Sequence, residues 1–141
     1  MDVTHLQLFL RVFAVVLMTA VFAAMLPIGV MDDIHQSIGL GRLPDGPIVE
    51  YLARSTSMFY ALHGALLWYL ASDLRRYRDL FRFYLWLSLA FAVGLFLTDL
   101  SAGLPLRWTL AEGPIVAAFT GIIMVLFRKT DARAAARKVE R

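Results

Sequence analysis

Long apolar stretches alternate with short charged segments along the chain. Four stretches, over residues 6–26, 55–72, 80–98 and 109–127, are interrupted only by Arg11, Arg82 and Glu112. A bilayer core about 30 Å thick is crossed by about 20 helical residues, and a helix satisfies its own backbone polar groups. The pattern therefore predicts an all-α, polytopic membrane protein: a four-transmembrane-helix bundle that occupies residues 1–130 as a single domain, followed by a basic tail over residues 131–141.

The connection over residues 28–46 is the only one with room for structure of its own. At its end, Asp45-Gly46-Pro47 is typical of a helix start, with proline in the first turn and aspartate as the cap. The second helix should therefore begin outside the bilayer core. Glu50 and Arg54 on this exposed turn have the spacing of an i,i+4 ion pair.

The start of the fourth helix has two candidates. Residues 109–112 match a capping box, in which Thr109 and Glu112 would satisfy the first backbone N–H groups. Gly113-Pro114 is a rival start, because proline suits the first turn of a helix. The sequence leaves both open.

Composition supports a membrane environment. Hydrophobic residues make up 60% of the 141 positions and charged residues 18%, whereas soluble domains lie nearer one half and one quarter. The chain has no cysteine, which excludes disulfides, thiol nucleophiles and cysteine-ligated metals or clusters. The poorly basic residues before the first apolar stretch favour a retained helix over a cleaved signal peptide.

The distribution of charge predicts the orientation. With the termini and the 73–82 connection on one side, that side holds 11 basic and 5 acidic residues, and the other side holds 3 basic and 6 acidic. The difference of +6 against −3 places both termini in the cytoplasm, and the inner (cytoplasmic) membrane is the expected location. The net charge of +3 thus indicates contact with anionic lipid, and not with nucleic acid.

Ionisable residues gather at the predicted outer end of all four helices. Carboxylates with one imidazole could hold a divalent cation, or act as acid and base on a substrate that arrives from the lipid. The alternative is that charges simply occupy helix ends, as Glu112 would at a helix N-terminus. Asp99 is expected to pair with Arg54 or Arg107, and an Asp99 without a basic partner would indicate a site. The residues of this outer cluster are Asp32, Asp33, His35, Glu50, Arg54, Asp99 and Glu112.

His63 lies near the centre of the second apolar stretch. An ionisable group at that depth is costly and usually faces the bundle interior, where it could relay protons, contact a quinone or haem, or bond a hydroxyl of a facing helix. The small residues Ser57, Ala61 and Ala65, with Gly64 beside them, predict a close helix contact within the chain or in a dimer. The candidate ligand or proton site thus comprises His63, Asp99, Glu112, Arg54, His35 and Asp33; no metal is assigned.

The segment over residues 54–64, Arg-Ser-Thr-Ser-Met-Phe-Tyr-Ala-Leu-His-Gly, opens the second helix after the long outer connection. In this segment and in its four apolar stretches the chain resembles the small DoxX-like bacterial membrane proteins. The resemblance implies a compact four-helix bundle and, for some members, quinone-dependent redox chemistry. It carries over no catalytic residue.

These patterns favour a binding or accessory membrane protein, which holds a hydrophobic small molecule or lipid, pairs with a protein partner or a second copy, or serves as a subunit of a membrane complex. The alternative is a membrane enzyme or carrier for a lipophilic substrate that uses the outer cluster. No cofactor is indicated by a motif: the sequence contains no phosphate-binding loop, no HExxH and no dinucleotide fingerprint.

Overall fold

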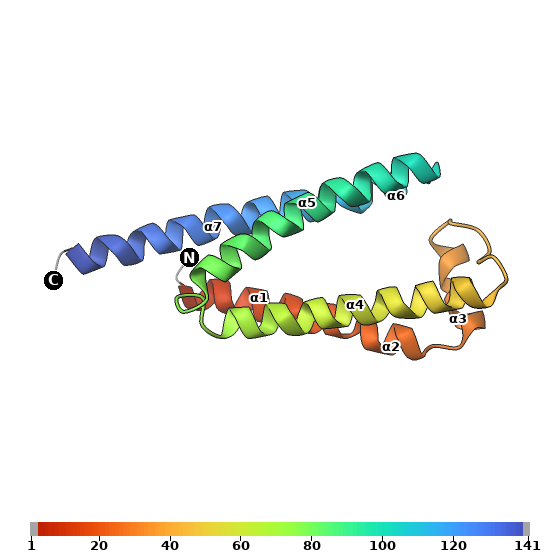
Figure 1. The fold of residues 1–141 in the computed structure, drawn as a ribbon, viewed down its shortest axis with the longest axis horizontal. Coiled ribbons are helices and arrows are strands. Elements are labelled where there is room, and N and C mark those ends of the chain that lie inside the picture. Colours follow the sequence, from red (N-terminus) through yellow and green to blue (C-terminus); the bar gives the residue numbers. More distant parts are fainter. Residues whose placement is uncertain (1–2, 140–141) are drawn as a thin grey trace. The chain divides into compact units, whose positions relative to one another are not determined.

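The computed structural model describes residues 3–139, with side chains placed over residues 4–132, and every regular element in this part is a helix (Figure 1). The all-α prediction is confirmed for these residues. The helices form two compact units, an N-terminal unit over Leu8–Ser72 and a C-terminal unit over Met1–Gln7 and Asp73–Arg141. The elements are α1 (Val3–Met18), α2 (Ala20–Met25), α3 (Ile28–Ser37), α4 (Pro47–Ser72), α5 (Arg78–Ala102), α6 (Leu106–Ala111) and α7 (Gly113–Val139).

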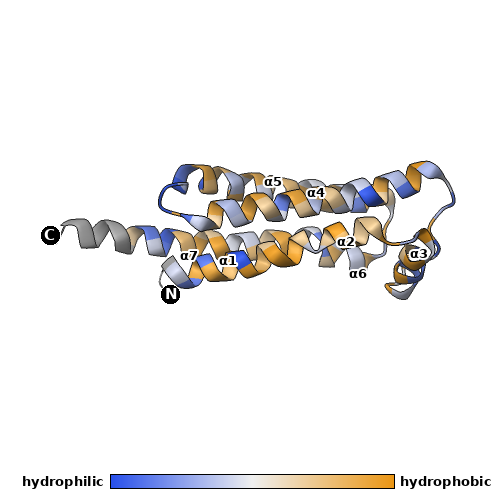
Figure 2. Cartoon of the chain, turned by 90° about the horizontal axis from the view of Figure 1, so that it is seen from below, coloured by the Kyte–Doolittle hydropathy of each residue, from blue (hydrophilic) through white to orange (hydrophobic). Residues whose placement is uncertain are grey.

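Three helical segments of the described chain are long and apolar enough to cross a membrane: Thr4–Met25, Arg78–Ala102 and Leu106–Ala132. They coincide with the first, third and fourth predicted spans. The second predicted span lies inside α4, which is long enough but less apolar, because it includes His63 and hydroxyl-bearing residues such as Ser57 and Tyr60. Figure 2 shows this mixture of polar and apolar residues along α4.

The first span is interrupted, whereas the sequence predicted one continuous helix over residues 6–26. The hydroxyl of Thr19 donates to the carbonyl of Val16 at 2.6 Å, between the end of α1 and the start of α2. Such back-bonding of a hydroxyl competes with the helical ladder and often bends a helix. Pro27 follows α2, and the chain then enters α3, so the long connection does contain structure.

Helix α4 begins at Pro47, as predicted. The carbonyl of Gly46 accepts hydrogen bonds from the N–H groups of Val49 and Glu50, at 3.1 and 3.3 Å. Gly46 has a φ of 145°, which side chains rarely adopt. Gly46 therefore occupies the cap position that the sequence assigned to Asp45.

The N-terminal unit is held by a close backbone approach between α4 and α1. A Cβ at Gly64 would lie 2.7 Å from the carbonyl oxygen of Ala14 and 2.8 Å from the backbone nitrogen of Met18. Only glycine fits at this distance. A close helix contact is thus present within the chain, as predicted. Gly64 makes this contact, whereas Ala65, one of the small residues expected to form it, is exposed.

The C-terminal unit has a similar close backbone approach at a glycine, between α7 and α5. A Cβ at Gly113 would lie 2.7 Å from the carbonyl oxygen of Ala92 and 2.9 Å from the Cβ of Phe96. Toward the other end of the pair, the rings of Phe81 and Phe127 meet edge to face, with centroids 5.0 Å apart. The two contacts define an antiparallel register for α5 and α7.

Helix α7 starts at Gly113, with Pro114 in its first turn, so the second of the two candidate starts is correct. The capping box is wrong, because Thr109 lies inside the additional short helix α6, where its hydroxyl contacts the carbonyl of Pro105 at 3.5 Å. The α5–α6 connection needs Gly103, whose φ is 68°.

Charged residues close the end of the C-terminal unit near Arg82. The guanidinium of Arg82 on α5 binds the carboxylate of Asp131 on α7, and Arg78 approaches the same carboxylate at 3.9 Å. Helix α7 continues from there to Val139, so it includes most of the segment predicted as a separate tail. The side chains of residues 133–141 lie outside the described residues.

The glycine contacts lead to a prediction with internal controls. Alanine at Gly64 or Gly113 should lower the free energy of unfolding by about 1–3 kcal/mol, because the added methyl group would overlap a neighbouring backbone. Alanine at Gly94 or Gly121, where nothing lies within 4 Å, should be neutral or should stabilise the helix by up to about 1 kcal/mol. Thermal melting of the four variants in mild detergent measures the difference. Equal effects at all four positions would contradict the two crossings.

Candidate functional site

The predicted site residues divide between the two units. Asp33, His35, Arg54 and His63 belong to the N-terminal unit, and Asp99 and Glu112 to the C-terminal unit. Within the part of the chain that the structure describes, no three histidine, aspartate or glutamate residues form a group that could hold a metal ion. The chemistry of each position therefore depends on its own surroundings.

Asp32 organises the connection that follows α3. One of its carboxylate oxygens accepts a hydrogen bond from the backbone N–H of Leu43 at 2.7 Å, and the other accepts from the side-chain amide of Gln36 at 2.9 Å. Arg42 approaches the same carboxylate at 3.9 Å, but its side chain is 85% exposed, so this ion pair adds little. The charge of Asp32 thus holds the loop against α3.

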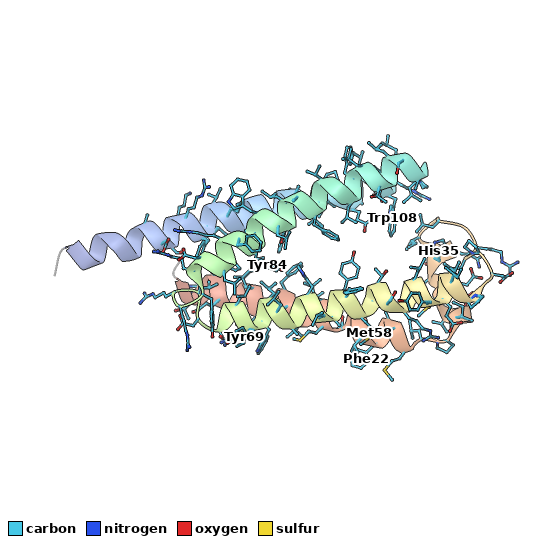
Figure 3. The ribbon with its side chains drawn as sticks, viewed as in Figure 1. Phe22, His35, Met58, Tyr69, Tyr84 and Trp108 are labelled. Carbon is cyan, nitrogen blue, oxygen red and sulfur yellow. The ribbon has the colours of Figure 1, made fainter. Side chains whose placement is uncertain are left out.

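His35 on α3 also helps to hold the loop that follows this helix (Figure 3). Its Nδ1 lies 2.7 Å from the carbonyl oxygen of Gly41. A carbonyl only accepts, so Nδ1 carries the proton of this hydrogen bond, and in a neutral ring Nε2 is then an acceptor. Gly41 has a φ of 84°, which suits glycine. His35 therefore fixes the shape of the loop, and its neighbour Asp33 is exposed.

Arg54 joins the start of α4 to the end of α2. Its guanidinium donates to the carbonyls of Ala24 and Leu26, the latter at 3.2 Å, and to the carboxylate of Glu50 at 2.9 Å. The last carbonyls of a helix have no partner in the helix itself, and a cation there also suits the helix dipole. The predicted Glu50–Arg54 ion pair is confirmed, with a nitrogen–oxygen distance of 2.8 Å.

A second arginine contact in the N-terminal unit was missed from the sequence. The guanidinium carbon of Arg11 lies 5.4 Å from the ring centroid of Trp68, in a cation–π arrangement. The antiparallel register that Gly64 sets against Ala14 places Trp68 opposite Arg11 and Arg54 opposite Ala24. The crossing glycine was therefore the signal that could have found both contacts.

His63 precedes Gly64 on α4, and its side chain is exposed. The sequence predicted that His63 faces the interior of a bundle, and this stays a prediction. His63 lies one residue from the crossing of α4 with α1 at Gly64.

Asp99 is the exception among the charged residues of the predicted site. Its side chain is 4% exposed, and within the described residues its Oδ2 is buried without a hydrogen-bond partner. Arg54, one of the two partners predicted for it, instead binds within its own unit. Thr109 on α6 is also buried, at 1% exposure.

Glu112 connects α6 and α7. Its φ and ψ of −89° and −83° lie outside the helical values and set α6 off from α7. Its backbone N–H still donates to the carbonyl of Trp108, and its carbonyl still accepts from the N–H of Val116. One carboxylate oxygen accepts a hydrogen bond from the indole N–H of Trp108 at 2.9 Å. Figure 3 shows Trp108 on α6. Glu112 is therefore tied to α6, and not to the first turn of α7 as a cap.

No protein-family model, curated protein or solved structure matches the chain. Of the predicted site residues, His35 and Arg54 have structural hydrogen bonds, and the side chain of Glu112 is tied to α6. Among these residues, Asp99 alone combines burial with a side-chain oxygen that has no partner in the described part of the chain.

This contrast predicts opposite outcomes for two substitutions. Asp99→Asn should keep the free energy of unfolding within about 1 kcal/mol of the original or raise it, because it removes a charge that forms no structural bond. Arg54→Gln should lower it by about 1–3 kcal/mol, because the carbonyls at the end of α2 lose a charged donor. Melting in mild detergent compares the two. A larger loss for Asp99→Asn than for Arg54→Gln would show that Asp99 is structural.

Proposed function

We propose that the chain is an integral membrane protein of four transmembrane helices that works by binding, either to a hydrophobic small molecule or lipid or as a subunit of a membrane complex. The observation that carries this proposal is the small share of each apolar helical segment that is buried. Only 17% of the most apolar window in Thr4–Met25 is buried, and 22% in each of the other two segments. The remaining apolar side chains are wholly or partly exposed, which is favourable in lipid and unfavourable in water.

The pairing of α4 with α1 and α2 supports the fourth span. Its 26 residues are about 39 Å long at 1.5 Å per residue, enough to cross a bilayer core. Arg54, near the start of α4, contacts the end of α2, and Trp68, toward the other end of α4, lies beside Arg11 of α1. Helix α4 therefore follows the first apolar segment along most of its length. A helix paired in this way shares the depth of its partner in the membrane.

The orientation and location follow from the charges. With four spans, the basic connection and the basic end of α7 lie on one side, which the positive-inside rule assigns to the cytoplasm. Both termini are then cytoplasmic, and the α3 loop and Asp99 lie toward the outside. A bacterial inner membrane is the corresponding location, and the resemblance to DoxX-like proteins is part of the same proposal.

Binding is favoured over catalysis by the way the polar groups are used. Asp32, His35 and Arg54 each make hydrogen bonds that shape the fold. Broad outward apolar faces suit a lipid, a hydrophobic ligand or a neighbouring membrane helix. The second candidate, an enzyme or carrier for a lipophilic substrate, is favoured by one observation, the unpartnered oxygen of Asp99.

Native mass spectrometry of the protein, released from mild detergent, tests the proposal. We expect the 15.9 kDa chain to carry a lipid, a hydrophobic small molecule or a second protein that is lost when a harsher detergent is used. The reason is that outward apolar faces keep their partners when the detergent does not compete for them. A bare single chain in every mild detergent would refute a binding function.

A further inference from the structure

Asp99 retains an energetic cost that its own chain does not relieve. A buried polar group without a hydrogen-bond partner costs about 1–3 kcal/mol, and a charged group costs more. Buried polar groups in proteins nearly always have a partner for this reason. Two other buried hydroxyl groups of the C-terminal unit illustrate the rule, since Thr130 donates to the carbonyl of Phe127 at 2.8 Å and Thr109 contacts the carbonyl of Pro105.

The carboxyl group of Asp99 is also not needed to end α5. The N–H of Leu104 donates to the backbone carbonyl of Asp99 at 3.1 Å, and the N–H of Gly103 donates to that of Leu100 at 3.2 Å. With Gly103 in the left-handed conformation, these bonds form a complete Schellman motif. The backbone therefore ends the helix, and any residue type could occupy position 99 without losing these bonds.

Helix α6 follows the turn at Gly103 and contacts α5 within the C-terminal unit. It has six residues and is set off from α7 at Glu112, whose φ and ψ of −89° and −83° depart from helical values. Discontinuous helices within apolar spans are a recurrent feature of binding sites in membrane proteins.

The surroundings indicate which molecule would enter. Leu100, Leu106 and Leu110 are exposed on α5 and α6, so the surface of these two helices is apolar. Oδ2 of Asp99 on α5 is a carboxylate oxygen that needs a hydrogen-bond donor. A donor that is also positively charged gives a hydrogen bond roughly twice as strong as a neutral one. A carboxylate likewise disfavours anionic head groups.

We infer that Asp99 is the polar anchor of a site between α5 and α6 for a lipophilic molecule with a cationic, hydrogen-bond-donating head group, such as a long-chain amine. The inference rests on the proposed function and adds the chemical class of the ligand. The hydrocarbon chain lies along the leucines of α5 and α6, and the ammonium group donates to Oδ2.

Chain-matched probes test the inference in lipid nanodiscs that contain the whole protein. Radiolabelled dodecylamine should bind saturably after subtraction of empty nanodiscs. Unlabelled dodecylamine should displace it, dodecanol should displace it more weakly, and dodecanoate should not. Asp99→Asn should weaken dodecylamine binding at least tenfold, and Asp45→Asn, a control at an exposed carboxylate of the other unit, should leave it unchanged.

Three results would overturn the inference. The first is equal binding of dodecylamine to the Asp99→Asn variant. The second is equal displacement of dodecylamine by all three probes from the unaltered protein. This measurement needs no variant, and such a result would leave a binding function without an anchor at Asp99. The third is no saturable binding of dodecylamine at all. The proposed function itself would fail only if the bare chain were also found by native mass spectrometry.

Discussion

Close backbone contact at two glycines determines how the helices of each unit pair. Helices in lipid gain little from hydrophobic burial against one another, so their association depends on van der Waals packing and on hydrogen bonds. Gly64 brings α4 onto α1, and Gly113 brings α7 onto α5, with backbone atoms less than 3 Å from where a Cβ would be. In each unit the crossing sets an antiparallel register, and the other contacts follow from it.

The antiparallel registers determine which partners the charged side chains of each unit can reach. In the N-terminal unit, Arg11 meets Trp68 and Arg54 meets the last carbonyls of α2. In the C-terminal unit, Arg82 meets Asp131 at one end, and Asp99 is buried at the other. The three arginines thus make contacts that hold helices together, although Nε of Arg11 is also buried without a hydrogen-bond partner among the described residues. Among the same residues, the carboxyl group of Asp99 has no ion pair or hydrogen bond to another helix, and this difference is why we place ligand binding there.

Much of the fold could be predicted from the sequence, because apolar stretches of helical length leave few alternatives. The start of α4 at Pro47 and the Glu50–Arg54 ion pair follow from local rules, and both are present. The helix α3 and the breaks at Thr19 and Glu112 were missed, because hydropathy does not reveal where a helical ladder is interrupted.

The candidate site was harder to predict, because it depends on partners distant in sequence. Arg54 was one of the two predicted partners of Asp99, yet Arg54 binds the end of α2, 28 to 30 residues away along the chain. His35 was a candidate ligand from its residue type and its place in the outer cluster, whereas its hydrogen bond to Gly41 gives it a structural role. The local sequence around Asp99 gives no sign that its side chain is buried.

The central claim is that α4 crosses the membrane beside α1 and α2, because four spans and the orientation both depend on it. The chain has no cysteine, so single cysteines at Asp45 and Arg75, exposed residues on either side of α4, can report on its two ends. A membrane-impermeant maleimide should label the cysteine at position 45 in intact cells, and the cysteine at position 75 only after the membrane is permeabilised. Labelling of both positions from the same side would contradict the claim.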